Sequence, residues 1–259
     1  MATFLFDQII FGPVNSRRLG VSLGINLLPI ESKFCNYNCI YCECGWTPGK
    51  ESPKPIFHAA LDVASALEAK LQEMVAAGNP PDVITFAGNG EPTVHPDFAA
   101  IIDLTLALRE KFVPNCKVAV LSNATMLHNA TVVAALKRVD QNILKLDSAF
   151  DATAKLINQP LGGFSTERLV ERMQAFGGEL IVQTMFLKGG SNGVLIDNTT
   201  PDELDAWMDL IVRIAPKQVM IYTIARDTPL DTLEKIPVER LNEIAASLRL
   251  RGFDVQVSA

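Results

Sequence analysis

The stretch Cys35-Asn36-Tyr37-Asn38-Cys39-Ile40-Tyr41-Cys42 places three cysteines at the spacing C-x3-C-x2-C. Thiolates at these offsets can converge on one compact iron–sulfur cluster, because a short loop can wrap around three corners of a cube. Since only three thiolates are offered, one iron of a four-iron cluster would keep no protein ligand and would be open to a substrate or cofactor. The stretch therefore predicts Cys35, Cys39 and Cys42 as ligands of a [4Fe-4S] cluster.

A structural zinc site is the alternative interpretation of these cysteines. Zinc sites usually pair C-x2-C units and close with four Cys or His ligands. The nearby candidate for a fourth ligand is Cys44, and no histidine lies close in sequence. With one residue between Cys42 and Cys44, the chain is too short for both to reach different corners easily, so we expect Cys44 not to be a ligand.

Length and composition indicate one α/β domain spanning residues 1–259. The chain has 48% hydrophobic and 20% charged residues, as expected of an ordinary globular protein. We find no apolar run near the ~20 residues that a membrane helix needs and no signal-peptide plan at the N-terminus. Five cysteines, three of them clustered, argue against a disulfide framework. These features predict a cytoplasmic protein without a membrane segment.

Charge is unevenly spread along the chain. The net charge is −6, yet residues 1–60 hold five Lys/Arg and four Asp/Glu, so the acidity lies in the remainder. An acidic protein gains little from attraction to a phosphate backbone, which disfavours a large nucleic-acid footprint. A local docking edge at Arg17 and Arg18 stays open.

Strand-like and helix-like segments alternate along the chain. Strands are expected over residues 20–28, 82–86, 116–121, 142–146, 180–187, 218–224 and 253–257. Helices are expected over residues 58–77, 98–112, 129–139, 165–176, 200–214 and 238–250. Such βα units imply parallel strands with helices outside, and six units fall short of the eight of a closed barrel. Chemistry in such folds gathers where the strands end.

The cysteine spacing, with Tyr41 just before the third cysteine, resembles the radical S-adenosylmethionine (SAM) superfamily. The resemblance covers roughly residues 15–225 and implies a partial (β/α)6 TIM-type barrel, with residues 226–259 as a C-terminal extension. It also implies two cofactors, a [4Fe-4S] cluster and SAM, whose amino and carboxylate groups chelate the open iron. By the same resemblance, Tyr41 is expected to pack beside SAM's adenine; the alternative is that it shields the cluster from water.

The turn Gly88-Asn89-Gly90-Glu91-Pro92-Thr93 resembles the family's glycine-rich motif, usually written GGE, which holds SAM's amino group. An ammonium needs exposed carbonyls and a carboxylate, and glycine lets the backbone approach closely. Asn89 departs from the common Gly-Gly form. We therefore expect Gly88, Asn89, Gly90 and Glu91 to bind SAM, and an ordinary structural turn is the alternative.

Further polar residues follow the later strands. Ser122 and Asn123 stand where the family often carries Thr-Asn-Gly, so they are expected either to shape the SAM pocket or to form a simple turn. Lys145 and Asp147 alternate with a leucine, so both face the lumen of the barrel. In the family, polar groups there contact SAM's ribose and carboxylate; a structural ion pair is the alternative.

The last two strands contribute weaker candidates. Gln183 shares a face with Met185, and we expect Gln183 in the cofactor pocket, whereas a lumen methionine is more often packing. Arg226 is expected either to bind an anionic substrate group in a forked geometry or to lie on the surface.

The resemblance implies reductive cleavage of SAM to a 5′-deoxyadenosyl radical, which abstracts hydrogen from an unidentified substrate. Residues 13–20 and 183–189 resemble the wyosine-synthetase-like subgroup, which modifies a guanosine in tRNA. Activation of a glycyl-radical enzyme is another possibility within enzymes. An iron–sulfur sensor or electron-transfer module is the non-enzyme alternative, and the glycine motif argues against it because a sensor needs no SAM cradle.

Two kinds of partner are expected. An external one-electron donor, such as flavodoxin or ferredoxin, would reduce the cluster. A macromolecular substrate, protein or RNA, would close a barrel mouth that has no second domain above it, because radical chemistry must be shielded from water. The alternative is that residues 1–20 and 226–259 fold over the mouth.

Overall fold

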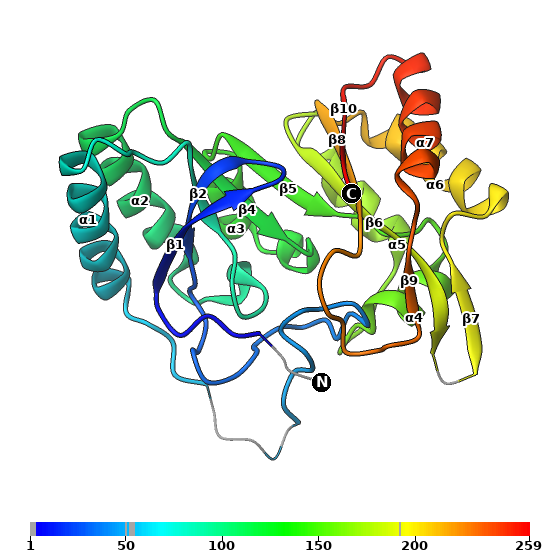
Figure 1. Cartoon of the computed structure of the whole chain (residues 1–259), viewed down its shortest axis with the longest axis horizontal. Helices are drawn as coiled ribbons and strands as arrows, with labels where there is room; N and C mark the ends of the chain where they lie inside the picture. The colour runs from blue at the N-terminus through cyan, green and yellow to red at the C-terminus, as the bar shows by residue number, and fades with distance from the viewer. Residues whose placement is uncertain (1–3, 50, 52–54, 192) are drawn as a thin grey trace.

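The computed structural model describes residues 4–49, 51, 55–191 and 193–259, and its centre is a curled half-barrel sheet (Figure 1). Hydrogen bonds join its strands in the order β1-β2-β3-β4-β5-β6-β8-β10, and β7 and β9 pair with β6. Helices cover the outside of the curve (Figure 1). The prediction of an α/β partial barrel is therefore confirmed.

Seven neighbouring strands of this sheet run parallel. They are β2 (Gly20–Ile25), β3 (Val83–Phe86), β4 (Lys117–Ser122), β5 (Gln141–Lys145), β6 (Ile181–Ser191), β8 (Gln218–Thr223) and β10 (Val255–Ser258). The helices between them are α1 (Ala60–Ala76), α2 (Phe98–Phe112), α3 (Ala130–Leu136), α4 (Asp151–Asn158), α5 (Thr166–Gln174), α6 (Pro201–Ile214) and α7 (Val238–Leu250). The six expected βα units are all present, and β10 adds a further parallel strand.

Several short elements were not expected from the sequence. They are β1 (Ile10–Ser16), β7 (Val194–Asp197), β9 (Leu233–Lys235), helix α4, and the 3-10 turns η1 (Pro92–Val94) and η2 (Thr125–His128). β1 pairs antiparallel with β2, and β7 and β9 flank an extension of β6 beyond the barrel. β1, β7 and β9 are largely exposed, so they lack the apolar alternation that reveals a half-buried strand.

The outward and inward faces of the strands pack against different parts of the protein. The outward face is rich in Val, Ile, Leu and Phe and packs under the helices in the main core. Five inward residues from neighbouring strands pack against each other and against Leu19, and they fill the lower part of the lumen. They are Val83, Ala119, Ile143, Ile181 and Met220. Polar chemistry is therefore confined to the lumen above this layer and to the strand ends.

The C-terminal strand contacts the turn between β1 and β2. Arg17 Nη1 donates to the Ala259 carbonyl at 2.7 Å, and Gln256 Nε2 donates to the Arg18 carbonyl at 3.0 Å. Because β10 also pairs with β8, residues 226–259 complete the sheet rather than hang from it. No helix among the described residues is long and apolar enough to cross a membrane.

Trp207 of α6 anchors the outer layer behind β5 and β6. Its side chain is buried, and its Nε1 donates to the Leu146 carbonyl at 3.2 Å and lies 3.1 Å from Thr184 Oγ1. We expect Trp207→Ala to lower the free energy of unfolding by about 3–5 kcal/mol, because it empties a large core site. Urea unfolding followed by circular dichroism measures this. Val212→Ala, at an exposed site on the same helix, should change it by less than about 0.5 kcal/mol, and an equal loss in both variants would contradict the assignment.

Candidate active site

The segment with the three cysteines, residues 33–45, is called the cysteine loop. It lies across the C-terminal ends of the strands because backbone hydrogen bonds hold it on two sides. On one side Phe34 N donates to the Asn89 carbonyl at 2.8 Å, and Glu91 N donates to the Phe34 carbonyl at 3.2 Å. On the other side Ile40 N donates to the Ile157 carbonyl at 2.9 Å. The loop is therefore held between the turn after β3 and the end of α4.

Two side-chain amides point at the sulfur atoms. Asn123 Nδ2 lies 3.6 Å from Cys35 Sγ, and Asn158 Nδ2 lies 3.5 Å from Cys39 Sγ. N–H groups directed at thiolate sulfur orient the ligands of an iron–sulfur cluster and tune its reduction potential. The sequence predicted Asn123 at the site but not Asn158. Asn158 lies in the short helix α4, and residues 147–164 show no clear helical pattern in the sequence.

The thiols differ in their acidity. Burial raises the pKa of Cys35 to about 12 and that of Cys39 to about 11. The neighbouring Cys44 thiol lowers the pKa of Cys42, and the Lys33 ammonium acts in the same direction. Because metals bind thiolates, loading a cluster here must release protons, most of all from Cys35 and Cys39.

Lys33 is a buried cation inside the cysteine loop. It is 3% exposed, and its Nζ donates to the Gly45 carbonyl at 2.8 Å. Within the described part of the chain, no carboxylate forms a salt bridge with it. A buried ammonium is costly unless an anion lies near it. Thiolates bound in a cluster would supply that negative charge, so the site fits an anionic metal cluster.

Cys44 and Cys116 differ in their distance from the cysteine loop. Among the residues that the structure describes, no three His, Cys, Asp or Glu side chains are grouped to hold one metal ion. Cys44 lies next to the three cysteines predicted as ligands, with its Sγ 3.4 Å from the Gly88 carbonyl oxygen. Cys116 stands just before β4, at the opposite end of the strands, away from the cysteine loop.

The glycines of the turn after β3 are required by close backbone packing. Gly88 and Gly90 have φ angles of +127° and +143°, which L side chains rarely adopt. A Cβ at Gly90 would overlap the Phe34 carbonyl oxygen, and one at Gly88 would lie 2.5 Å from Asn26 Oδ1. The glycines therefore let the cysteine loop approach the turn, whatever the turn itself binds.

Asn89 and Glu91 are both buried but face different neighbours. The Asn89 side chain holds the N-terminal segment: its Oδ1 accepts from Phe6 N, and its Nδ2 donates to the Phe6 and Pro29 carbonyls. This side chain therefore points away from the cysteines, and the Asn89 carbonyl is taken by the loop.

The Glu91 carboxylate connects the ends of β3 and β4. Its Oε1 accepts hydrogen bonds from Thr93 N, Thr93 Oγ1 and Ser122 Oγ, and its Oε2 accepts one from Asn123 N at 2.6 Å. Burial raises its pKa, while these donors act in the opposite direction. Among the described residues Oε2 accepts one hydrogen bond, so it has room for one more donor.

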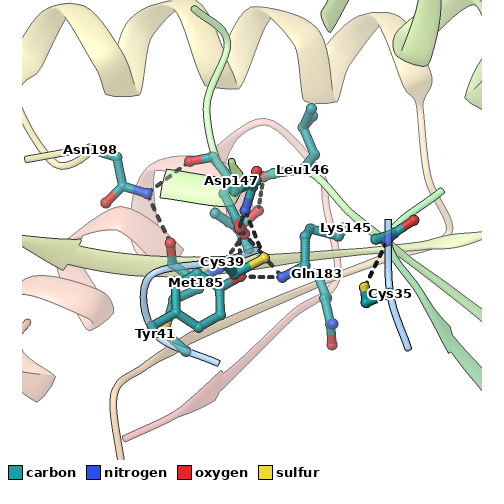
Figure 2. Close-up of polar contacts among 12 residues, drawn as sticks. Cys35, Cys39, Tyr41, Lys145, Leu146, Asp147, Gln183, Met185 and Asn198 are labelled. Carbon is teal, nitrogen blue, oxygen red and sulfur yellow. Dashed lines mark hydrogen bonds and ion pairs between the residues drawn. The ribbon is translucent and has the colours of Figure 1, made fainter. Parts of the chain in front are cut away.

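Tyr41, Lys145 and Asp147 form one buried network beside the cysteines (Figure 2). Tyr41 Oη donates to Asp147 Oδ2 at 2.6 Å, and Lys145 Nζ lies 3.4 Å from the same oxygen and contacts Tyr41 Oη. Asn158 Nδ2 also donates to Asp147 Oδ2, at 2.7 Å. Burial disfavours the charged form of Lys145, but Asp147, Tyr222 and Cys39 together outweigh it and raise the lysine pKa. The ion pair that the sequence left open is therefore formed.

Asp147 also holds the neighbouring strand. Its Oδ1 accepts from Met185 N at 3.0 Å, and Asn198 Nδ2 donates to the Asp147 carbonyl at 2.7 Å, as Figure 2 shows. Met185 is buried and packs with Tyr37 and Ile40, which agrees with the packing role expected for it.

Gln183 and Arg226 have partners that the sequence did not reveal. Gln183 Oε1 accepts from Arg18 Nη1 at 2.7 Å, inside the barrel. Arg226 Nη1 lies 2.6 Å from Glu43 Oε2, in an exposed ion pair that joins the segment after β8 to the cysteine loop. Arg226 is therefore exposed, whereas Arg18 is half-buried.

Comparisons with known proteins agree with this geometry. The profile of the family described as "Radical SAM superfamily" matches residues 31–211, which include the cysteine loop and the strands that carry the network. The chain belongs to the radical SAM superfamily. It is therefore an enzyme, and membership implies a [4Fe-4S] cluster and SAM as cofactors.

Individual relatives extend the match. A UPF0026 protein of Synechocystis sp. is 32% identical over 225 residues, covering 85% of this chain and 77% of that protein. A radical SAM methyltransferase from Sphaerobacter thermophilus aligns with a TM-score of 0.67 and 16% identity, over 92% of this chain and 65% of that one. TYW1 with a lysine-pyruvate adduct bound aligns with a TM-score of 0.62 and 15% identity, over 88% of this chain and 73% of that one. At such identities the solved structures show the fold alone.

Gly90→Ala tests whether the glycine turn positions the cysteine loop. The new Cβ would overlap the Phe34 carbonyl, so we expect the loop to shift and the iron content after anaerobic reconstitution to fall at least several-fold. Iron analysis and the cluster absorbance measure this. Gly163→Ala is the matched control, since nothing lies within 4 Å of its Cβ position. Full iron content in Gly90→Ala would contradict the assignment.

Proposed function

We propose that Cys35, Cys39 and Cys42 hold a [4Fe-4S] cluster whose fourth iron binds SAM. The observation that carries this proposal is the buried Lys33 ammonium beside three cysteines, two of which, Cys35 and Cys39, receive side-chain amides. When bound, the cluster supplies an electron that splits SAM to methionine and a 5′-deoxyadenosyl radical, which abstracts hydrogen from the substrate. The protein's own residues bind and orient SAM and the substrate, and they shield the radical from water.

Different residues are proposed to hold different parts of SAM. The Gly88–Gly90 backbone and Oε2 of Glu91 accept from its ammonium group, next to the cysteine loop. Ser122 and Asn123 act mainly by orienting that carboxylate, to which both donate. Tyr41, Lys145 and Asp147 form the wall where the adenosyl part lies, and their mutual bonds keep the Tyr41 ring in one orientation.

The substrate side of the proposal is coarser. An external one-electron donor, such as flavodoxin or ferredoxin, is proposed to reduce the cluster. A macromolecular substrate stays a proposal as well. The N-terminal segment and the segment after β8 both contact Glu43, through Phe4 N at 3.0 Å and through Arg226, and these contacts favour the alternative in which the two segments cover the mouth of the barrel. The two described cavities, of about 550 and 670 Å³, lie along α1 and beneath the barrel, away from the cysteines.

Cys42→Ala tests the cluster assignment. We expect it to lose the broad absorbance near ~400 nm after anaerobic reconstitution, because a cluster needs its thiolate set. After reduction and addition of SAM, it should form no 5′-deoxyadenosine, whereas the wild type should. Chromatography of the products measures this.

Cys44→Ser is the matched control for Cys42→Ala. It lies two residues away and removes a thiol of similar burial. We expect four irons per chain and preserved 5′-deoxyadenosine formation. Loss of the cluster in Cys44→Ser but not in Cys42→Ala would exchange the roles of the two residues and overturn the proposed ligand set.

Glu91→Gln tests the ammonium cradle. The change removes a negative charge from a charge-assisted hydrogen bond, so the affinity for SAM should fall about tenfold, equivalent to about 1.4 kcal/mol. Calorimetry on the reconstituted protein measures the affinity, and iron analysis should show an unchanged cluster. Unchanged SAM affinity would mean that Glu91 serves only to join β3 to β4.

A further inference from the structure

Arg18 places a positive charge inside the barrel. It lies in the turn between β1 and β2, yet its guanidinium turns inward, and its Nη1 donates to Gln183 Oε1 at 2.7 Å. Its Cζ lies 4.6 Å from the centre of the Tyr222 ring, in a cation–π contact. Gln183 pairs in register with Lys145 (labelled with it in Figure 2), so the guanidinium lies in the same row of the lumen as that network.

The partners of Arg18 position its charge without neutralising it. An amide oxygen and an aromatic face leave the positive charge whole, and the described residues offer it no salt bridge. Lys145, by contrast, is paired with Asp147 at 3.4 Å. Arg18, Lys145 and Asp147 together therefore leave one positive charge in the lumen.

The neighbouring arginine shows that this placement is specific. Arg17 is exposed and donates to the Ala259 carbonyl at the surface. The Arg18 backbone carbonyl accepts from Gln256 Nε2 at 3.0 Å, while the Arg18 guanidinium turns toward Gln183. The two neighbouring arginines therefore have different surroundings.

We propose that Arg18 binds an anionic group of the substrate, a carboxylate or a phosphate, in the lumen. The guanidinium is planar and offers donors in a fork, which suits both oxyanions. One of its donors is taken by Gln183, and the others are available to a ligand. This inference rests on the proposed radical chemistry, because it gives the chemical class of the substrate of that same site.

Arg18 is distinct from the proposed subsite for the ammonium and carboxylate groups of SAM. The glycine turn and the cysteines lie beyond the C-terminal ends of the strands, whereas Arg18 enters from the turn at the start of β2 and reaches Gln183 within β6. A ligand anion on Arg18 would thus lie deeper in the barrel than SAM's carboxylate. Binding measurements can separate the two roles.

The experiment uses the reconstituted, SAM-loaded protein with inorganic phosphate and acetate as separate probes. Calorimetry of wild type, Arg18→Gln and Arg17→Gln gives the dissociation constant of each probe. We expect saturable binding of at least one probe to the wild type, at least tenfold weaker in Arg18→Gln and unchanged in Arg17→Gln. The probe that binds more tightly identifies the group as phosphate or carboxylate.

SAM binding separates the possible failures. Arg18→Gln should keep the wild-type SAM affinity and 5′-deoxyadenosine formation. Loss of SAM affinity in Arg18→Gln would place Arg18 in the SAM subsite and overturn this inference while leaving the proposed function intact. Equal probe binding in wild type and Arg18→Gln, or no binding of either probe to the wild type, would also overturn it. A wild type that neither binds nor cleaves SAM would defeat the proposed function itself.

Arg18→Lys covers the case in which Arg18→Gln does not fold, which thermal unfolding reports. It keeps the charge but loses the fork, so we expect it to bind the probes more weakly than wild type and to keep its SAM affinity. Probe affinity equal to wild type in Arg18→Lys would exclude forked recognition and overturn the proposal.

Discussion

The backbone pairing of Phe34 with the turn at Gly88–Glu91 is the contact on which the rest of the site depends. Phe34 donates to the Asn89 carbonyl and accepts from Glu91 N, which forms an isolated parallel bridge at Gly90. This bridge brings the cysteine loop against the turn expected to bind SAM, so both cofactor sites are set by one contact. It requires glycine at position 90, because any Cβ would occupy the place of the Phe34 carbonyl oxygen.

Buried charges complete the site because each one needs an opposite charge or a set of dipoles. Asp147 has Lys145 as its counter-charge and also receives Tyr41, Asn158 and the Met185 amide. Glu91 is stabilised by hydrogen bonds from neighbouring residues. Lys33 and Arg18 lack a carboxylate partner among the described residues. The cysteine loop, through Lys33, is thus suited to an anionic cluster. The lumen, through Arg18, is suited to a carboxylate or phosphate.

Much of this architecture was predictable from the sequence, and the parts that were not have a common physical reason. The six βα units and the cysteine loop depend on local patterns, and the structure contains all of them. β1, α4 and the partners of Asp147 depend on contacts between distant segments. Asn158 lies 11 residues from Asp147 and 119 from Cys39, so no local pattern joins the three.

The position of Arg18 in the barrel also depends on contacts between distant segments and could not be predicted from the sequence. In sequence it is half of an Arg-Arg pair near a turn, which is typical of a solvated surface. Its partners Gln183 and Tyr222 stand 165 and about 200 positions further along the chain, and only the curling of the sheet brings β6 and β8 opposite the turn before β2. The edge strands of the half-barrel are β1 and β10, and the β1–β2 turn contacts β10 and the residue after it through Arg17 and Arg18. Because no strand pairing closes the barrel there, the turn can direct the Arg18 side chain toward Gln183 and Tyr222 in the lumen.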